Sequence, residues 1–355
     1  MRIGLYGLPT AGKSFILNAV RNFEVLSGSS LLREITSDFH SLSESGKETV
    51  RRQLADTLAG KDRFIMDGHY SFGDDIVFTE SDGRLYDVFL YLYVRPDILR
   101  SRMEDSVRNR KYLIYDIEQW QESEIIALRQ YCHENEKDFY VLDNPEKGYF
   151  PDISMVLEFI DSIACGFSCA KYARRCADSI LKKFSSGSIT LADGDRTLSE
   201  EDSSQVLGYR THLFDGNFYT GFQSWRHFRE MSDYLRLIEY SMADAERSPL
   251  TPNRRVLDRI TGPTVILTTG YYQAWKKMAD NLGMQVYHGE MMSADTKYFI
   301  TKFLQEAGLH VTAYGDSMND LYMLRQANAG YLVKKPDGSL SRSLKDAKTE
   351  GLAYV

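Results

Sequence analysis

The feature that most constrains the fold is a short loop near the start of the chain, Gly-Leu-Pro-Thr-Ala-Gly-Lys-Ser, at residues 7–14. An apolar segment typical of a β-strand precedes it, and the helix-like segment FILNAVRNF follows. Gly7 and Gly12 let backbone N–H groups close around a phosphate at the start of the helix. In this pattern Lys13 would reach the β- and γ-phosphates of ATP, and Ser14 would bind Mg²⁺. A strand, a tight loop and a helix in this order predict a parallel α/β domain that binds a nucleotide.

Strand-like and helix-like segments alternate through the rest of the N-terminal half. Helix-like segments such as KETVRRQLADTLAG lie between apolar runs that are rich in β-branched or aromatic residues. This alternation is typical of parallel βαβ units with helices on both faces of the sheet. We therefore predict a doubly wound parallel sheet, with strands within residues 2–8, 23–28, 63–68, 86–94 and 138–144.

These segments resemble the adenylate-kinase-like branch of P-loop kinases over residues 1–145. The resemblance implies that Arg33, in LSGSSLLRE, contacts the phosphate of the acceptor. It also implies that Asp67, in FIMDGHY, positions a Mg²⁺-bound water or polarises the acceptor. His69 and Tyr70 stand in the region where nucleoside monophosphate kinases of this family have a phosphate-binding arginine. His69 is therefore a candidate substrate-binding residue, and the departure argues against a nucleotide acceptor.

The segment VRPDILRSRMEDSVRNRK, at residues 94–111, resembles the strand, helix and lid of the same kinases. The resemblance makes Arg102, Arg108 and Arg110 candidates to clamp the transferred phosphoryl group, because a guanidinium binds phosphate oxygens in pairs. Arginines on a lid can equally form a solvated face. Both interpretations stay open for each of the three.

A second pattern, LADGDRTL at residues 191–198, carries two carboxylates one residue apart. The preceding SSGSITL predicts a short strand, and residues two apart on a strand point to the same side. Asp193 and Asp195 can therefore project from the end of the strand toward one ligand. Paired carboxylates at such a place suit Mg²⁺ and nucleophilic chemistry on a phosphoryl group. Two further runs follow downstream, VILTTG at 265–270 and YGDSMND at 314–320.

In this order the patterns resemble the haloacid-dehalogenase-like (HAD) phosphatases, over roughly the last half of the chain. The resemblance implies that Asp193 is the nucleophile, which takes the phosphoryl group as an aspartyl-phosphate. It implies that Asp195 is the general acid and base, which protonates the leaving alcohol and later activates water. Thr269 stands where the family places a phosphate-binding serine or threonine, and Thr268 is the neighbouring candidate.

The same resemblance implies which charges surround the phosphate. Lys297 is the candidate that neutralises the phosphate and the nucleophile, and Lys302 is the alternative. Asp316 resembles the family's Mg²⁺ ligand, with Asp320 in support. A dianionic ester that approaches a carboxylate needs cationic charge between the two, which Mg²⁺ and a lysine supply. The expected metal-binding residues are Asp193, Asp195, Asp316 and, in the N-terminal half, Ser14.

The length of 355 residues suggests two domains of ordinary size. The clearest linker signal is SSGS at 185–188, so we expect a P-loop kinase domain at 1–184 and a HAD-like phosphatase domain at 185–355. Residues 199–262 are rich in aromatic side chains and resemble the small helical cap of phosphoserine-phosphatase-like members. Four of these rings either line the substrate site or form the core of the cap: Phe218, Tyr219, Phe222 and Trp225.

Composition narrows the class of partner. The hydrophobic fraction of 43% and the charged fraction of 26% are those of a globular protein, and the net charge of -7 argues against a broad nucleic-acid-binding surface. No apolar stretch approaches the ~18 residues that a membrane span needs. Met1 leads directly into the first predicted strand, so we expect no signal peptide and a cytoplasmic location.

The sequence thus predicts a bifunctional, Mg²⁺-dependent enzyme. Its N-terminal half transfers the γ-phosphate of ATP to a small-molecule or nucleotide acceptor, and its C-terminal half hydrolyses a phosphomonoester. The alternative is a polynucleotide end-healing enzyme, which joins a 5′-kinase to a 3′-phosphatase in the same domain order. A third possibility is that one half serves only as a nucleotide-sensing or interaction module, although both sets of motif residues are complete.

Overall fold

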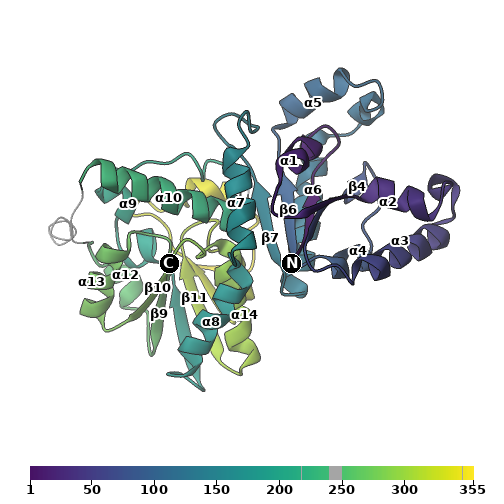
Figure 1. Ribbon diagram of the computed structural model, residues 1–355. Helices are drawn as coiled ribbons and strands as arrows, with labels where there is room; N and C mark the ends of the chain where they lie inside the picture. The colour runs from purple at the N-terminus through teal and green to yellow at the C-terminus, as the bar shows by residue number, and fades with distance from the viewer. Residues whose placement is uncertain (217, 240–249, 346) are drawn as a thin grey trace. The chain divides into compact units, whose positions relative to one another are not determined.

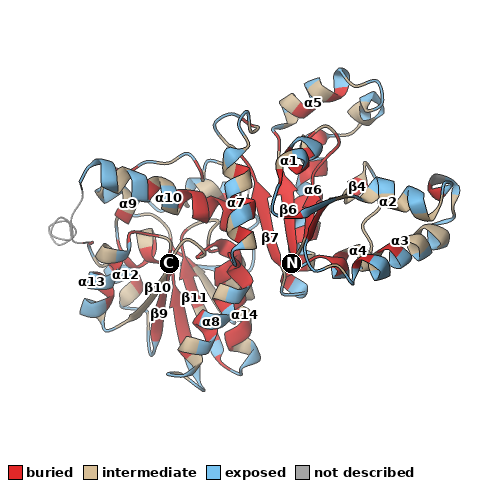
Figure 2. Cartoon of the chain, viewed as in Figure 1, coloured by how far each residue is buried: buried red, intermediate tan, exposed pale blue. Residues whose placement is uncertain are grey.

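The computed structural model describes residues 1–216, 218–239, 250–345 and 347–355. The described chain divides into two compact units, Met1–Phe167 and Ser168–Val355 (Figure 1). Each unit is built around its own parallel sheet, and the central strands of both sheets are buried (Figure 2). Two parallel sheets in one chain confirm the predicted α/β class.

The division between the units falls before helix α8 (Cys169–Leu181), whereas the linker SSGS predicted it after this helix, between residues 184 and 185. The physical reason is the packing of α8 along α14 (Ala294–Glu306) in the second unit. The face that α8 buries consists mainly of small side chains: Cys169, Ala170, Ala173, Cys176, Ala177 and Ile180. Small residues allow two helices to pack closely, so α8 contributes to the core of the second unit.

The first unit contains a five-stranded sheet in the order β2-β3-β1-β6-β7, and every neighbouring pair is parallel. Each strand lies within one of the five predicted segments. The chain runs from the central strand β1 outward to β2, returns through β3, and then crosses to β6 and β7 on the other side of β1. Right-handed crossovers, the rule for parallel strands, place helices on both faces of a sheet with this strand order. The strands are β1 (Arg2–Tyr6), β2 (Glu24–Ser27), β3 (Phe64–Asp67), β6 (Val88–Leu92) and β7 (Asp138–Leu142).

Several helices of this unit begin at residues that favour a helix N-terminus. The side chains of Ser43 and Asp116 accept N–H groups in the first turns of α3 and α6, and Pro96 stands in the first turn of α5. A short hairpin of β4 (Ser71–Phe72) and β5 (Asp75–Ile76) follows β3. The helices are α1 (Lys13–Ala19), α2 (Gly28–Ile35), α3 (Glu44–Leu58), α4 (Glu80–Leu85), α5 (Pro96–Glu104), α6 (Ile117–Glu134) and α7 (Ser154–Ala164).

The second unit contains a six-stranded sheet in the order β10-β9-β8-β11-β12-β13, with parallel neighbours throughout. The central strand β8 lies between β9 and β11, so the residues that follow these three strands meet at one edge of the sheet. The strands are β8 (Ser188–Ala192), β9 (Thr264–Thr268), β10 (Gln285–His288), β11 (His310–Gly315), β12 (Ala329–Leu332) and β13 (Ala353–Tyr354).

Helix α10 (Gly221–Leu237) runs across the edge of the second sheet at which the strands end (Figure 1). It lies in the segment 199–262 that we expected to form a cap; residues 217 and 240–249 of that segment lie outside the described residues. Phe222 and Trp225 are almost fully buried, as in a hydrophobic core. The other helices of the unit are α9 (Ser203–Val206), α12 (Arg254–Leu257), α13 (Tyr272–Leu282) and α15 (Leu321–Gln326), besides α8 and α14.

Within the described ranges, none of the helices combines the length and the apolar character that a membrane crossing requires.

Candidate active site

Asp193 is the first residue after β8, and its side chain is buried. Its N–H donates a hydrogen bond of 2.9 Å to the carbonyl of Tyr314, which fixes the end of β8 against β11. The strand ends before Asp195, because the chain turns through residues 194–198 and Arg196 adopts a φ of 58°. The two carboxylates therefore diverge, rather than projecting from one strand as the sequence predicted.

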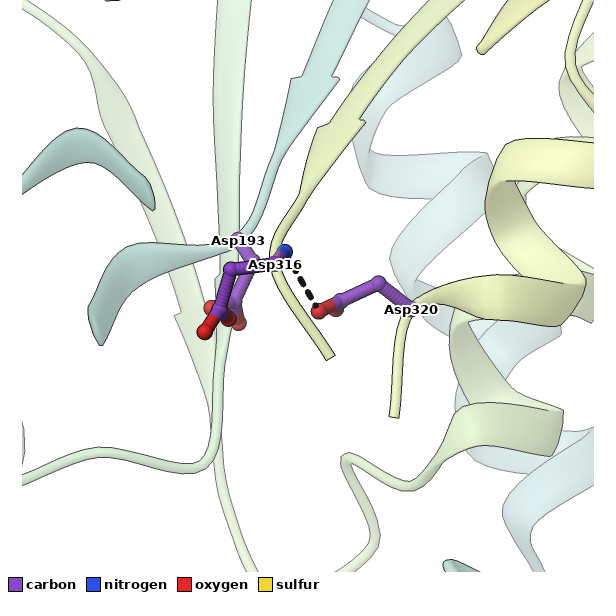
Figure 3. A group of neighbouring side chains, drawn as sticks. All are labelled: Asp193, Asp316 and Asp320. Carbon is purple, nitrogen blue, oxygen red and sulfur yellow. Dashed lines mark hydrogen bonds between the residues drawn. The ribbon is translucent and has the colours of Figure 1, made fainter. Parts of the chain in front are cut away.

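Three carboxylates converge beside this strand end (Figure 3). Asp193, Asp316 and Asp320 each offer an oxygen atom, and these atoms lie within 4.8 Å of one another. Asp316 follows β11, and Asp320 precedes α15. Among the described residues this is the one group of at least three acidic, histidine or cysteine side chains with metal-binding geometry. The expected set included Asp195 in place of Asp320.

Lys297 provides the cation of this cluster. Its Nζ lies 2.6 Å from Oδ1 of Asp193 and 2.7 Å from Oδ1 of Asp320, and its side chain is completely buried. The alternative, Lys302, lies one turn farther along α14 and pairs with Glu306 at 3.8 Å. Lys297, and not Lys302, is therefore the lysine that contacts Asp193.

Asp320 has both oxygens engaged. Oδ1 accepts from Lys297, while Oδ2 accepts from the N–H of Asp316 at 3.2 Å and from the N–H and Oγ of Ser317 at 3.1 and 2.9 Å. This carboxylate therefore holds the loop after β11 in place and orients Lys297. Asp193 and Asp316, whose side chains point in the same direction in Figure 3, are then the better placed pair of ligands for a cation.

The cluster contains more buried acid than its lysine can neutralise. Burial raises the pKa of Asp193 and of Asp316, and the neighbouring Asp320 raises both further. Burial alone would lower the pKa of Lys297, but Asp193 and Asp320 raise it above its usual value. The lysine thus stays charged, and the surplus of carboxylates calls for a second cation. An all-oxygen donor set of this kind fits Mg²⁺.

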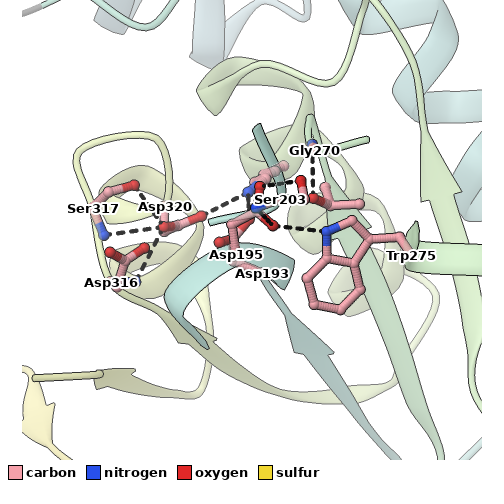
Figure 4. Close-up of polar contacts among 10 residues, drawn as sticks. Asp193, Asp195, Ser203, Gly270, Trp275, Asp316, Ser317 and Asp320 are labelled. Carbon is pink, nitrogen blue, oxygen red and sulfur yellow. Dashed lines mark hydrogen bonds and ion pairs between the residues drawn. The ribbon is translucent and has the colours of Figure 1, made fainter. Parts of the chain in front are cut away.

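The carboxylate of Asp195 is held apart from this cluster (Figure 4). Its Oδ1 accepts from the N–H of Ser203 at 3.0 Å and from Nε1 of Trp275 at 2.8 Å, and its Oδ2 accepts from Oγ of Ser203 at 2.9 Å. Burial raises the pKa of Asp195 to about 7, with a further increase from Asp202. A carboxyl group with a pKa near neutrality can both donate and accept a proton under physiological conditions.

The loop after β9 passes close to Asp195. A Cβ atom on Gly270 would lie 2.5 Å from Oδ2 of Asp195 and 2.6 Å from Oγ of Ser203, so only glycine fits there. The N–H of the next residue, Tyr271, donates to Oγ of Ser203 at 2.8 Å. The β9 loop, the first turn of α9 and the Asp195 carboxylate therefore form one hydrogen-bonded group.

Thr268 and Thr269 differ in their relation to the loop that follows β8. Thr268 is the last residue of β9 and is buried, and its Oγ1 accepts from the N–H of Gly270 at 2.9 Å. This Oγ1 is also 2.8 Å from where a Cβ of Gly194 would stand. Thr269 is only half buried. Thr268 therefore lies against Gly194, the residue after Asp193, and both threonines stay candidates for binding a phosphate.

Sequence reasoning missed Ser203 and Trp275, the two partners of Asp195. Ser203 is one of several serines in a polar stretch, and no motif marks it. The sequence indicated Trp275 only weakly: it lies on the buried face of α13, five residues after the glycine of the β9 loop. A tryptophan so close to the end of the strand can direct its ring N–H toward the site.

In the first unit, the predicted phosphate-binding loop joins β1 to α1. Nζ of Lys13 is buried and donates to the carbonyl of Gly7 at 2.5 Å and to that of Leu8 at 3.3 Å. Burial lowers the pKa of Lys13 to about 8. Gly7 has a φ of 139°, and a Cβ there would lie 2.7 Å from the carbonyl oxygen of Leu92. The loop therefore passes against β6 where a side chain would not fit.

Arg102 lies against the same loop. Its NH1 donates to the carbonyls of Thr10 and Ala11 at 3.3 and 3.2 Å, and its guanidinium lies over the ring of Tyr149 at 5.3 Å. Arg108, by contrast, is exposed. Burial lowers the pKa of His69, and the positive charges of Lys13 and Arg108 lower it further.

Asp67 and Arg33 are placed differently. Oδ1 of Asp67 accepts from the N–H of Gly28 at 3.2 Å, which ties the end of β3 to the start of α2. The Asp67 carboxylate also interacts electrostatically with Lys13. Arg33 is exposed on α2, and its Nε donates to the carbonyl of Ser29 in the same helix. The structure thus relates Asp67 to Lys13 but leaves Arg33 at the surface, and Ser14 is exposed at the start of α1.

A buried acid near Lys13 was also missed. Glu124 on α6 accepts from the N–H and Oγ of Ser71 at 2.9 and 2.7 Å, from Nε1 of Trp120 at 3.1 Å and from the hydroxyl of Tyr91 at 2.9 Å. The sequence pattern that could have revealed Glu124 is a glutamate on the buried face of a helix, among Trp120, Ile125 and Leu128. This network fixes the hairpin that follows Asp67.

Residues 6–121 match the family model of an AAA domain. No curated protein matches the chain at the level of sequence. The C-terminal region is similar in structure to solved HAD hydrolases. One is a substrate-bound phosphoserine phosphatase, with a TM-score of 0.31 and 15% identity, and the match covers 43% of this chain and 89% of that chain.

A second similar structure is a phospho-aspartyl intermediate analogue of phosphoserine phosphatase, with a TM-score of 0.30 and 14% identity, covering 42% of this chain and 87% of that chain. A third is a HAD-family hydrolase from Salmonella enterica serovar Typhi, with a TM-score of 0.30 and 17% identity, covering 43% and 64% of the two chains.

The order of the strands, the phosphate-binding loop and the carboxylate–lysine cluster define the class of the protein. It is an α/β protein with two parallel sheets, and residues 6–121, which include the P-loop sequence, match an AAA-domain family model.

Proposed function

We propose that the chain is a bifunctional, Mg²⁺-dependent enzyme that transfers a phosphoryl group from ATP at one site and hydrolyses a phosphomonoester at the other. The observation that carries the proposal is the Lys297 ammonium held between Asp193 and Asp320, at 2.6 and 2.7 Å. Complete burial of charged groups is costly. Such a cluster has a function where a carboxylate must attack an anionic phosphate ester, because the buried cation offsets the repulsion between the carboxylate and the ester.

Hydrolysis proceeds in two steps on the chain's own side chains. An oxygen of Asp193 attacks phosphorus, the bond from phosphorus to the ester oxygen breaks, and Asp195 gives its proton to the leaving alcohol. The ionised Asp195 then takes a proton from water, whose oxygen attacks phosphorus and frees inorganic phosphate from Asp193. A pKa of about 7 suits Asp195 for both transfers.

Asp193 and Asp316 are the side chains that would hold Mg²⁺, since Asp320 is occupied by Lys297 and by the loop after β11. When bound, the ion supplies Lewis-acid stabilisation of the phosphoryl charge. Thr268, beside the nucleophile loop, is the proposed donor to a phosphate oxygen, in place of Thr269.

In the first unit, Lys13 and the loop from Gly7 to Ser14 bind the phosphates of ATP. Arg102 secures the loop and faces the transferred group, while Asp67, close enough to Lys13 to interact electrostatically, orients the acceptor. Transfer is a single in-line step, in which the acceptor oxygen attacks the γ-phosphorus and ADP leaves. His69 and Arg33 are the proposed contacts of the acceptor, and Arg108 is a proposed contact of the transferred phosphoryl group.

The test combines both reactions in one assay. The protein would be incubated with Mg²⁺, γ-labelled ATP and a panel of nucleosides, nucleoside monophosphates, sugars, small alcohols and an oligonucleotide with a 5′-hydroxyl and a 3′-phosphate. We expect label on a small acceptor, and release of inorganic phosphate from a small ester that the Asp193→Asn variant does not catalyse. Phosphate release by that variant at the wild-type rate would contradict the phosphatase assignment.

The same assay decides the polynucleotide alternative. Label at the 5′ end of the oligonucleotide, together with loss of its 3′-phosphate, would make the protein an end-healing enzyme. An untouched oligonucleotide beside a labelled small acceptor would support metabolite chemistry.

A further inference from the structure

Helix α10 carries buried polar atoms that have no hydrogen-bond partner among the described residues. They are Oγ of Ser224 and Nδ1 of His227, and both side chains are more than nine-tenths buried. Residues three apart on a helix share a face, so these atoms lie side by side. Buried polar atoms are nearly always hydrogen-bonded, so this pair indicates a polar partner from outside the chain.

The protonation state of His227 determines which hydrogen-bonding groups that partner needs. Burial lowers the pKa of His227 to about 4, so at neutral pH its ring is uncharged and has one donor and one acceptor nitrogen. Ser224 likewise both donates and accepts. Neutral groups of this kind match hydroxyl groups rather than a charged ligand.

Farther along the same face of α10 lies a groove with a volume of about 680 Å³. The ring of His288 is 4.9 Å from that of Tyr272 and 5.6 Å from that of Phe228. Burial lowers the pKa of His288 to about 4, so this ring is also uncharged and offers an apolar face. The groove is lined mainly by Phe228, Met231, Leu235, Tyr271, Tyr272 and His288.

The groove continues from the candidate active site. The N–H of Tyr271 donates to Oγ of Ser203, which itself donates to Asp195. The ring of Tyr209 lies 5.6 Å from that of His227 and packs with Met231 and Tyr271. The buried pair of Ser224 and His227 is therefore connected through Tyr209 to the aromatic groove, and the groove through Tyr271 and Ser203 to the proposed acid/base.

We propose that this face of α10, with Tyr272 and His288, binds the nucleoside of a nucleoside monophosphate whose phosphate is attacked by Asp193, an inference that rests on the phosphatase function proposed above. The base stacks on the exposed face of this ring cluster, against Tyr272, and the sugar hydroxyls bond to Ser224 and His227. A groove of this volume is large enough for a nucleoside. Aromatic stacking accepts every base, so the site selects the class of leaving group rather than one base.

The test measures phosphate release by the full-length protein with Mg²⁺ from nucleoside monophosphates, their dideoxy analogues, phosphoserine, a hexose phosphate, a 3′-phosphorylated oligonucleotide and acetyl phosphate. Tyr272→Ala removes one stacking ring, and Tyr354→Ala is the matched control, since the two tyrosines are 39% and 44% exposed in the same unit. Ser224→Ala removes one hydroxyl contact without leaving a cavity of consequence.

We expect nucleoside monophosphates to be the best esters, and Tyr272→Ala to lower their kcat/KM at least about fivefold while acetyl phosphate and the Tyr354→Ala variant stay at the wild-type level. Ser224→Ala should reduce kcat/KM for ribonucleotides but not for dideoxy analogues. Preference for phosphoserine or the hexose phosphate, preference for a 3′-phosphorylated oligonucleotide, or indifference to Tyr272→Ala would overturn the inference. Failure of the wild type even with acetyl phosphate would instead overturn the phosphatase function.

Discussion

The two sites use a buried lysine in opposite electrostatic settings. Lys297 lies between two carboxylates, which raise its pKa, whereas Lys13 contacts only loop carbonyls at hydrogen-bond distance in the described structure, and burial lowers its pKa to about 8. The site of the second unit therefore has its cation fixed in advance by two carboxylates. In the first unit, we infer that the charge of Lys13 is stabilised when a phosphate binds. On the proposed function, the hydrolytic site is preformed and the transfer site is completed by its nucleotide.

The largest expected effect separates the two halves. Asp193→Asn should lower phosphate release by at least about 10³-fold, because it removes the nucleophile, and should leave transfer from ATP unchanged. Lys13→Ala should do the reverse. Parallel assays of both reactions on both variants are the measurement. Loss of both activities in a folded single variant would show that the sites are not independent.

The contrast between the lysines predicts a difference in stability. Lys297→Met leaves Asp193 and Asp320 without their buried cation and should lower the free energy of unfolding by about 3–5 kcal/mol. Lys302→Met, on the same helix but paired with Glu306 near the surface, should cost less than about 1 kcal/mol. Denaturant unfolding measures both. Equal losses would mean that the Lys297 cluster contributes no special stability.

Asp195 makes the phosphatase sensitive to pH. As general acid it must be protonated, so kcat/KM for an alkyl phosphate should fall about tenfold per pH unit as pH rises above its pKa of about 7. Acetyl phosphate has a leaving group that needs no proton, so its profile should stay flat over this range. A steep fall with both substrates would assign the titration to another group.

The smallest effect concerns the P-loop. Arg102→Ala removes the contacts to the carbonyls of Thr10 and Ala11 and should raise KM for ATP about tenfold. Arg100→Ala is the control, because Arg100 is exposed on the same helix. If both variants raise KM for ATP equally, the effect of Arg102→Ala comes from the loss of a positive charge and not from the loss of its contacts with the loop.

The sequence was sufficient for the strands and for the order of the motif residues. Each apolar run of the first half contains one strand, because central strands of a parallel sheet are buried on both faces and leave a continuous signal. The approach of Lys297 to Asp193, 104 residues apart, was expected from the resemblance of the sequence motifs. These features depend on local chemistry or on a resemblance that spans the whole domain.

The rest depends on tertiary packing that local patterns do not encode. The serine-rich linker at 185–188 was read as the domain boundary, but the small residues of α8 pack against α14 and place that helix in the second unit. Asp195 leaves the strand direction at the turn around Arg196 and meets Ser203 instead of the metal cluster. A pattern of alternate residues cannot predict where a strand stops.

The most direct test of the central claim, nucleophilic attack by Asp193, is to trap the phosphorylated protein. Asp195→Asn would be mixed with acetyl phosphate and Mg²⁺, quenched in acid and digested for mass spectrometry. Acetyl phosphate needs no acid for the first step, while the second step lacks its base, so the aspartyl-phosphate should accumulate. We predict a phosphoryl group on the peptide that contains Asp193, and none when Asp193→Asn is added to the variant. Turnover of acetyl phosphate by the wild type, with the trapped phosphoryl group on another residue, would contradict the account.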